Sequence, residues 1–291
     1  MSKLTNKFDL PSSIFSAIEN ISKQYTRGES DLSVSQLIDS PRIRLLKQHH
    51  AKDIEEDVSE LIYSILGTSV HNLIENSDKK SITEKRLYAD CEGWRLSGQL
   101  DRLLISDETI EDYKVTSAWS YVFPKESWEL QQNVYAWLCR QNKIKISKIQ
   151  IIGIFRDWQK SKANDSDNYP KLPIQVMPLR LWSNKKQDEY VKDRITLHQE
   201  AQYRFDNENF TPLCSDEDRW KDKEKFAVMI KGKKRAIKLH DEVEDAQDHA
   251  KNLSLTTKGV SVEVRPSIAR RCKDYCSVKQ FCDQAKKEGY V

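Results

Sequence analysis

Several features that would direct a chain to a membrane or out of the cell are missing from this sequence. No apolar run approaches the roughly 20 residues that a membrane-spanning helix needs. The first residues, MSKLTNKFDLP, lack the apolar core of a signal peptide. We therefore expect an intracellular, cytoplasmic protein with no membrane partner.

The sequence also lacks a strong charge of one sign and an abundance of cysteine. The net charge is only +3, so any surface for nucleic acid must be a local patch rather than a global excess. The six cysteines, in a reducing compartment, are expected to be thiols or metal ligands rather than disulfides. The His-Glu-x-x-His motif of zinc proteases is absent as well.

What the sequence does contain is typical of a globular protein with a heavily charged surface. Of its 291 residues, 38% are hydrophobic and 32% are charged, so the chain can bury a sizeable core. This length predicts one large domain, or one domain with a small additional module.

The stretch from Trp94 to Trp119 predicts two strands joined by a polar turn. Asp101 lies in the first strand, while Asp112 and Lys114 leave the same face of the second because they are two residues apart. Charges among apolar neighbours need compensation, which a divalent cation would supply to the two carboxylates. Lys114 could then orient or deprotonate a water, or neutralise charge on a phosphate. The alternative is a surface hairpin with a weak Asp–Lys ion pair.

Five features of the chain occur together. They are Gly98-x-x-Asp101, Asp112-x-Lys114, an upstream Gly67-x-x-x-His71-x-x-x-Glu75, a downstream Gln131-x-x-x-Tyr135, and cysteines near the C-terminus. This ordered set, which covers roughly residues 33 to 285, resembles the PD-(D/E)XK nuclease superfamily and more narrowly its RecB-type branch, which includes CRISPR-associated and phage exonucleases. The departure is Leu100 before Asp101, where the name of the family has proline.

This resemblance implies an α/β fold, in which a mixed restriction-endonuclease-like sheet is flanked by helices. It also implies roles for the motif residues. Mg²⁺ or Mn²⁺ would be held by Asp101, Asp112, the Tyr113 carbonyl and His71, with Lys114 acting on the water and the phosphate. Gln131 and Tyr135 would contact the lysine region or the DNA backbone. Taken alone, His71 could equally be an ordinary helix histidine, and Glu84 either the acidic residue that opens the preceding strand or an ordinary exposed glutamate.

Three segments are expected along the chain: a helical N-terminal cap over residues 1–52, a nuclease core over 53–210 and a C-terminal module over 211–291. In the cap, Ser33 is expected to begin a helical region that Pro41 interrupts. Arg42 and Arg44 make its second helix basic, as a solvated face or a DNA-facing edge. In the core, the hydrophobic pattern predicts helices over 53–77, 127–142 and 185–207, strands over 82–90, 144–155 and 174–181, and loops over 119–124 and 156–170.

The C-terminal module contains a cysteine pattern suited to a metal or cluster. Cys272, Cys276 and Cys282 are spaced C-x3-C-x5-C, and with Cys214 they give four thiolates for a tetrahedral zinc or a 4Fe–4S cluster. The spacing is wider than the C-x2-C pairs of zinc sites, and together with the resemblance this favours iron–sulfur. Zinc and free thiols are the alternatives. Cys91 and Cys139 are expected to be packed thiols.

Between these cysteines, the pattern predicts two short strands about a turn at Gly232, followed by a helix over 241–252. The turn is rich in positive charge, so it is either a solvated loop or a patch that contacts DNA phosphates without reading the sequence. The residues of this patch are Lys231, Lys233, Lys234 and Arg235.

We therefore expect a metal-dependent DNA exonuclease of phage or mobile-element type, hydrolysing phosphodiester bonds in recombination, replication or repair. Its partner would be single-stranded DNA or duplex ends, and an oligomer is compatible with the sequence. The alternatives are a non-catalytic DNA-binding subunit on a nuclease fold, a redox-regulated iron–sulfur DNA-binding protein, and a zinc-stapled adaptor.

Overall fold

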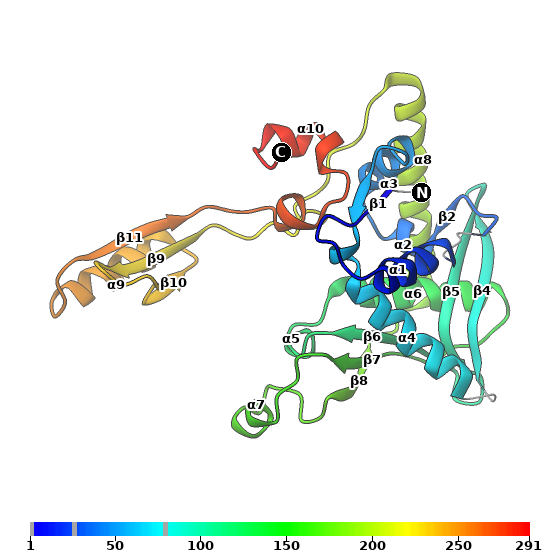
Figure 1. The fold of residues 1–291 in the computed structure, drawn as a ribbon, viewed down its shortest axis with the longest axis horizontal. Helices are drawn as coiled ribbons and strands as arrows, with labels where there is room; N and C mark the ends of the chain where they lie inside the picture. Colours follow the sequence, from blue (N-terminus) through cyan, green and yellow to red (C-terminus); the bar gives the residue numbers. More distant parts are fainter. Residues whose placement is uncertain (1–2, 25–27, 78–80) are drawn as a thin grey trace. The chain divides into compact units, whose positions relative to one another are not determined.

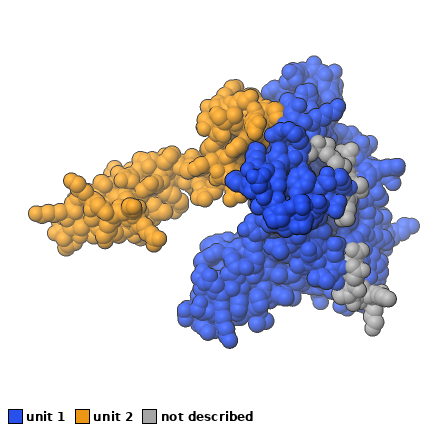
Figure 2. All heavy atoms as spheres, in the orientation of Figure 1, with its two compact units in different colours: residues 1–212 blue, residues 213–291 orange. Residues whose placement is uncertain are grey.

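The computed structural model describes residues 3–24, 28–77 and 81–291. The chain divides into two compact units, residues 1–212 and residues 213–291, which are described here one at a time (Figure 2). Within the described ranges, no helix is both long enough and apolar enough to cross a membrane.

Unit 1 is built on a mixed sheet, to which six of the described strands contribute (Figure 1). The long strands β4 (Ile82–Cys91), β5 (Trp94–Leu104) and β6 (Thr109–Thr116) are antiparallel neighbours. β7 (Lys148–Phe155) pairs with β6 in parallel, and β8 (Ile174–Leu179) pairs with β7 in antiparallel orientation. The short β2 (Leu32–Ser33) pairs in parallel with β5.

Helices cover this sheet and complete its core. α6 (Glu126–Gln141) packs against β4 to β7 and against α8 (Asn184–Glu208), while α4 (Ile62–Ser77) packs against β5, β6 and α1 (Ser12–Gln24). The main core joins Leu100 and Ile110 of the sheet to Val134 and Leu138 of α6. A second core lies where β7 and β8 meet the loop after β6, around Ile151. The predicted α/β fold, with a mixed sheet flanked by helices, is confirmed.

Most predicted elements of unit 1 are present, with boundaries close to those expected. The helix predicted over 53–77 is wrong in its first part, because residues 55–57 form β3 (Glu55–Asp57), which pairs with β1 (Lys3–Thr5). A short 3-10 turn (Val58–Glu60) follows, capped by the Asp57 carboxylate. The loops predicted over 119–124 and 156–170 contain the short helices α5 (Trp119–Val122) and α7 (Lys160–Asp165).

The two arginines of the basic helix belong to neither a solvated face nor a DNA-facing edge, while Lys47 and His49 of the same helix are exposed. Ser33 caps α2 (Val34–Leu37), and Pro41 begins α3 (Pro41–His49), as expected. Arg42 and Arg44, however, are both buried. Arg42 donates to the carbonyls of Thr211 and Pro212, at 3.0 and 3.1 Å, so its charge is used to hold the end of unit 1.

Unit 2 contains a three-stranded antiparallel sheet in the order β10-β9-β11. The strands are β9 (Lys225–Ile230), β10 (Lys238–His240) and β11 (Val260–Arg265), with α9 (Val243–Ser254) packed on them. The two strands and the helix predicted around the Gly232 turn are present, and Gly232 has the left-handed φ of +87° that glycine tolerates best.

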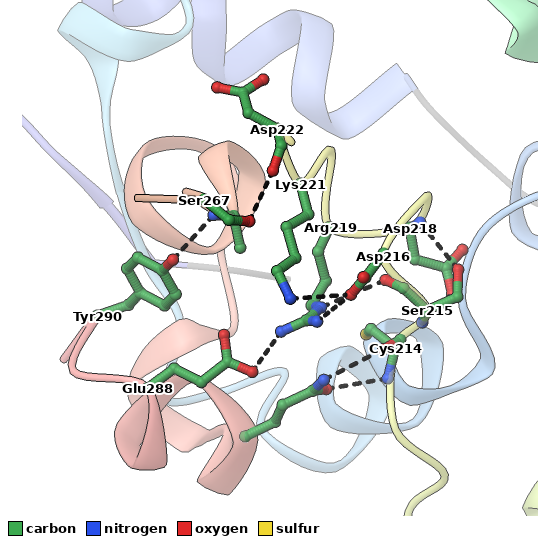
Figure 3. Close-up of polar contacts among 12 residues, drawn as sticks. Cys214, Ser215, Asp216, Asp218, Arg219, Lys221, Asp222, Ser267, Glu288 and Tyr290 are labelled. Carbon is green, nitrogen blue, oxygen red and sulfur yellow. Dashed lines mark hydrogen bonds and ion pairs between the residues drawn. The ribbon is translucent and has the colours of Figure 1, made fainter. Parts of the chain in front are cut away.

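The cysteine-bearing part of unit 2 consists of short turns rather than long elements. It includes a π-helical turn (Arg271–Tyr275), a 3-10 turn (Lys279–Phe281) and α10 (Asp283–Lys287). The buried Arg219 guanidinium forms ion pairs with Asp216 and Glu288 (Figure 3). The Gln284 amide bonds both the N–H and the carbonyl of Cys214, at 2.9 and 3.1 Å. These contacts join the chain around Cys214 to the C-terminal turns.

Candidate active site

The candidate site lies where the regular pairing of β5 and β6 ends. The antiparallel register runs from Leu104 opposite Thr109 to Arg102 opposite Glu111. At the next position, the Asp101 carboxylate accepts a hydrogen bond from the Tyr113 backbone N–H, at 2.9 Å. A side chain thus replaces the backbone carbonyl of a regular ladder, and this fixes the Asp101 carboxylate next to the strand that carries Asp112 and Lys114.

An irregularity in β4 and β5 brings a second carboxylate to the same point. Glu84 has a left-handed φ of +49°, and the pairing of Glu84 with Asp101 is missing from an otherwise continuous register. Leu100 and Leu103 are both fully buried in the same core, so the alternation of β5 breaks between them. Such interruptions redirect side chains, and they are common beside active sites. Here the interruption lies at Glu84 and Asp101, the two acidic residues that meet beside α4.

His71 of α4 completes this group. Its Nε2 lies 3.1 Å from the Tyr113 carbonyl. Because a carbonyl only accepts, Nε2 must carry a proton, and Nδ1 is the nitrogen that gains or loses one. Nδ1 then faces Glu84 Oε1 at 3.5 Å and Asp101 Oδ1 at 3.6 Å. The hydrogen bond with Glu84 raises the pKa of His71 and lowers the pKa of Glu84. Among the described residues, these three form the group of His, Cys, Asp or Glu ligand atoms that lie within 4.8 Å of one another.

Asp112 and Lys114 form a tight pair beside this group. Their Oδ2 and Nζ atoms are 2.7 Å apart, and Asp112 is only 2% exposed. Burial, followed by the nearby charge of Asp112, raises the pKa of Asp101 to about 7. Burial alone would lower the pKa of Lys114, but the charges of Asp112 and Asp101 outweigh it and raise that pKa overall. Lys114 is therefore held as an ammonium ion.

The residues present fit a divalent cation. His71, Glu84 and Asp101 converge with nitrogen and oxygen donors, and carboxylate oxygens are the ligands that Mg²⁺ and Mn²⁺ prefer. The buried Oδ2 of Asp112 has no hydrogen bond of ordinary geometry among the described residues, only the neighbouring ammonium. The Tyr113 carbonyl, expected as a further ligand, accepts the His71 N–H and so orients this ring.

A cleft of about 690 Å³ opens over the group. His71, Glu84 and Asp101 line it, and so do Gln131 and Tyr135 of α6, so the structure brings these predicted residues together. Gln131 donates to the Tyr135 hydroxyl at 3.2 Å. Asp112 and Lys114 are not among the lining residues. Much of the remaining lining is polar and uncharged, with Ser33, Ser35, Ser64, Thr68, Asn72 and Ser97.

Sequence reasoning left Glu84 undecided and missed its two supporting residues. Arg86 donates to Gln99 at 2.6 Å, and Gln99 donates to Glu84 at 2.5 Å, so a polar chain runs along the cleft to the acidic group. In the sequence, polar residues occupy every second position of β5, at Ser97, Gln99 and Asp101, but residues 83–86 of β4 are all polar, so no pattern singles out Glu84 and Arg86. The side chain of Glu75, the last residue of the histidine motif, lies outside the described residues.

In unit 2 the predicted cluster residues are partly gathered. Cys272 and Cys282 are buried, while Cys214 and Cys276 are half-buried. Burial raises the pKa of Cys272, and the charges of Cys276 and Cys282 raise it further. Among the described residues, no three cysteine sulfurs come within 4.8 Å of one another. Of the other two, Cys139 is a buried thiol whose pKa burial raises to about 12, and Cys91 is half-buried.

The predicted basic patch lies on the surface of unit 2. Lys231, Lys233, Lys234 and Arg235 are all exposed in the turn between β9 and β10.

A carboxylate pair with a neighbouring lysine, on strands of a mixed sheet, is the arrangement of the nucleases that the motifs resemble. The profile of the PD-(D/E)XK nuclease superfamily matches residues 53–283, and the chain belongs to this superfamily. A comparison with curated proteins gives no match.

Three solved structures are similar to the chain at low identity. The protein SSO0001 is 16% identical with a TM-score of 0.43, over 63% of this chain and 84% of that one. A phage-related exonuclease from Haemophilus somnus 129PT is 14% identical with a TM-score of 0.32, over 68% and 83% of the two chains. A putative exonuclease from Eubacterium rectale is 14% identical with a TM-score of 0.28, over 69% and 78%.

Proposed function

We propose that the chain is a divalent-metal-dependent DNA exonuclease of the RecB-type branch, acting in recombination, replication or repair. The observation that carries this proposal is the convergence of His71, Glu84 and Asp101 beside the buried Asp112–Lys114 pair. Membership of the nuclease superfamily supports nuclease activity in general. The exonuclease mode, the metal and the pathway are parts of the proposal.

The metal ligands would be His71, Glu84, Asp101 and Asp112. When bound, Mg²⁺ or Mn²⁺ would neutralise charge on the scissile phosphate and acidify a water. Hydrogen bonds within the chain fix the orientation of two of these ligands. Tyr113 N–H holds Asp101, and the Tyr113 carbonyl holds the His71 ring so that Nδ1 faces the carboxylates. Fixed donors of this kind need little reorganisation during the reaction.

Lys114 is suited to stabilise negative charge. Its ammonium lies 2.7 Å from the Asp112 carboxylate, beside the proposed metal ligands, so it would orient the attacking water and neutralise charge on the phosphate in the transition state. Gln131 and Tyr135 line the cleft, and together with the serine and threonine hydroxyls that also line it they would form hydrogen bonds with the phosphate backbone.

For unit 2 we propose a structural 4Fe–4S cluster held by Cys214, Cys272, Cys276 and Cys282. The spacing of Cys272, Cys276 and Cys282, and the hydrogen bonds that tie Cys214 to Gln284 of the C-terminal turns, support it. Zinc in the same place is the alternative, and iron and sulfide analysis of protein purified without oxygen separates the two. The exposed patch of Lys231, Lys233, Lys234 and Arg235 would contact DNA phosphates.

Digestion of end-labelled single-stranded and duplex DNA with Mg²⁺, Mn²⁺ or EDTA tests the nuclease proposal. We expect cleavage with a metal and none with EDTA. Asp112→Ala and Lys114→Ala should each lower the rate by at least about 100-fold, since charge-stabilising groups are typically worth that much. Lys145→Ala is the matched control, because Lys145 forms an exposed ion pair with Glu108 at the far end of the hairpin.

Near-normal cleavage by either active-site variant would remove that residue from the mechanism. DNA binding without any cleavage by the wild type, with either metal, would instead favour the non-catalytic DNA-binding alternative.

A further inference from the structure

Three exposed aromatic side chains of unit 1 lie on segments that meet where β6 and β7 end: Trp119 and Phe123 pack together after β6, and Tyr63 is covered by Arg156, which follows β7. Tyr63 is 58% exposed, Trp119 53% and Phe123 71%, although large aromatic side chains are usually well buried. Trp119 and Phe123 are near-parallel, with ring centroids 6.2 Å apart and an angle of 22° between their planes. We call these three residues the aromatic ridge.

The ridge is rigidly supported from within unit 1. The buried Tyr169 meets the Trp119 ring edge-on, with centroids 6.4 Å apart. The Asp157 carboxylate accepts from the Ser117 hydroxyl and the Ala118 N–H, both at 2.7 Å, and so fixes the start of α5. The ridge is thus a prepared surface, because little freedom is lost when something binds to it.

The ridge lies on, or directly after, the two elements that carry residues of the candidate active site. β6 carries Asp112 and Lys114 and ends at Thr116, three residues before Trp119 (Figure 1). The Thr116 carbonyl accepts from Arg156 N–H at 3.0 Å, and the Arg156 guanidinium covers the Tyr63 ring at 4.4 Å. Tyr63 lies eight residues before His71 on α4, a distance of about 12 Å along the helix.

Two exposed cations lie on the segments of the ridge. The Arg156 guanidinium covers the Tyr63 ring, and Lys125, two residues after Phe123, has its ammonium over the Trp128 ring at 5.8 Å. The Asp157 carboxylate is occupied by its bonds to Ser117 and Ala118, and the exposed Glu126 follows Lys125. Open ring faces flanked by cations form a combination that binds single-stranded nucleic acid, in which bases stack on the rings and cations follow the phosphates.

We propose that the aromatic ridge binds unpaired bases of single-stranded DNA, next to the phosphate that enters the active site. This inference rests on the proposed nuclease function and specifies its substrate as single-stranded DNA. In a duplex the base faces are stacked on one another and are not free to cover the rings. The ridge therefore distinguishes a single strand from a continuous duplex.

The test measures the binding of the full chain, in EDTA, to a labelled oligothymidylate and to a labelled blunt hairpin duplex. We expect Tyr63→Ala, Trp119→Ala and Phe123→Ala each to raise the Kd for the oligothymidylate about tenfold, the loss expected for one stacked base. Affinity for the duplex should stay unchanged. Trp119→Phe, which keeps a ring face, should restore most of the affinity.

Matched controls come from exposed aromatic residues elsewhere. Tyr203, 66% exposed on α8, matches Tyr63, and Trp220, 52% exposed in unit 2, matches Trp119. Tyr203→Ala and Trp220→Ala should bind the oligothymidylate like the wild type. Unchanged binding by the ridge variants would overturn the proposal, and so would an equal loss on the duplex, which would indicate a surface for duplex ends.

A change of oligomeric state in Trp119→Ala, with normal DNA binding, would also overturn the proposal and assign the ridge to contacts between copies of the chain. Cleavage with Mn²⁺ separates this inference from the nuclease function. A wild type that binds the oligothymidylate through the ridge but cleaves no DNA would contradict the nuclease proposal alone. Normal cleavage and binding of single strands by the ridge variants would contradict this inference alone.

Discussion

At the scale of single residues, Glu84 shows how a strained backbone can serve a site. A left-handed φ is uncommon outside glycine and asparagine, and it persists where the surroundings compensate for its cost. Here the Glu84 carboxylate accepts from Gln99 and faces His71. The same conformation turns Glu84 toward Asp101, so we expect it to take part in holding the metal.

Metal binding by Glu84 can be measured without any DNA. A cation that binds only the folded protein raises the free energy of unfolding by about 2.7 kcal/mol at about 100 times its Kd. We expect Mn²⁺ to stabilise the wild type in thermal unfolding, and Glu84→Gln and Asp101→Asn to lose most of this gain. Glu55→Gln removes an exposed carboxylate of β3 and should keep it. If Mn²⁺ stabilised Glu84→Gln as much as the wild type, Glu84 would be excluded from the metal ligands.

His198 gives a second prediction at this scale, on the pH dependence of stability. Its ring is fully buried, and Nδ1 accepts from Arg44 Nε at 3.1 Å, while Nε2 donates to the Leu37 carbonyl at 3.2 Å. Burial, followed by the charges of Arg194 and Arg44, lowers the pKa of His198 to about 3. In the unfolded chain the pKa is about 6.5. Between these values the unfolded state binds a proton that the folded state does not, so stability falls as the pH decreases.

His198→Gln keeps an acceptor and a donor but does not titrate. Between pH 7 and pH 5, the wild type should lose about 2 kcal/mol more of its free energy of unfolding than this variant. Urea unfolding at the two pH values measures the difference. Parallel losses in both proteins would mean that His198 is not the neutral buried group described here.

At the scale of elements, two glycines with different surroundings test how α6 and α4 are packed. A Cβ on Gly98 of β5 would lie 2.7 Å from side-chain atoms of Leu138, Tyr135 and Val34. Gly98→Ala should therefore destabilise the protein by roughly 1–3 kcal/mol through overpacking. It should also displace Tyr135 from the cleft.

Apart from the chain neighbours and helix backbone of Gly67, inside α4, no described residue has an atom within 4 Å of a Cβ added there. Gly67→Ala should raise stability by about 0.5–1 kcal/mol, because alanine loses less backbone entropy in a helix. Chemical unfolding measures whether Gly98→Ala lowers and Gly67→Ala raises the free energy of unfolding. Since Gly67 lines the cleft, a more stable Gly67→Ala with slower cleavage would show that DNA needs the space above this residue. A lower stability of Gly67→Ala would contradict the conclusion that a Cβ at this position meets no neighbouring atoms.

The hairpin of β5 and β6 could be predicted from the sequence because its information is local. A polar turn separates two apolar stretches, and the two-residue period alone puts Asp112 and Lys114 on one face. The group around Glu84 depends on information that is not local. The backbone turn at Glu84, the Arg86–Gln99 chain and the burial of Arg42 and Arg44 arise from contacts with distant strands and with the end of unit 1. No spacing in the sequence encodes them.

At the scale of the whole molecule, the chain consists of two units with very different means of stabilisation. Unit 1 has two extended hydrophobic cores. In unit 2 the cysteine-bearing part, residues 213–224 and 266–291, is formed of short turns and buries few large side chains. Its length is close to the limit of about 40 residues below which small folds usually need disulfides, a metal or a partner. Because four cysteines lie in this part, at 214, 272, 276 and 282, a metal cluster is the stabiliser we expect.

Loss of the cluster should therefore loosen unit 2 and leave unit 1 intact. Cys276→Ala removes one proposed ligand at a half-buried position, and Cys91→Ala is the matched half-buried thiol outside the cluster. In protein purified without oxygen, we expect Cys276→Ala to lose iron and sulfide. Its backbone amides should then exchange faster around Cys214 and over residues 269–285, while the exchange of unit 1 stays unchanged, because a bound cluster stabilises only the part that holds it. Cys91→Ala should match the wild type in both measurements. Zinc in place of iron, with the same exchange pattern, would keep the structural role and change the metal, whereas unchanged exchange in Cys276→Ala would show that the turns of unit 2 are stable by packing alone.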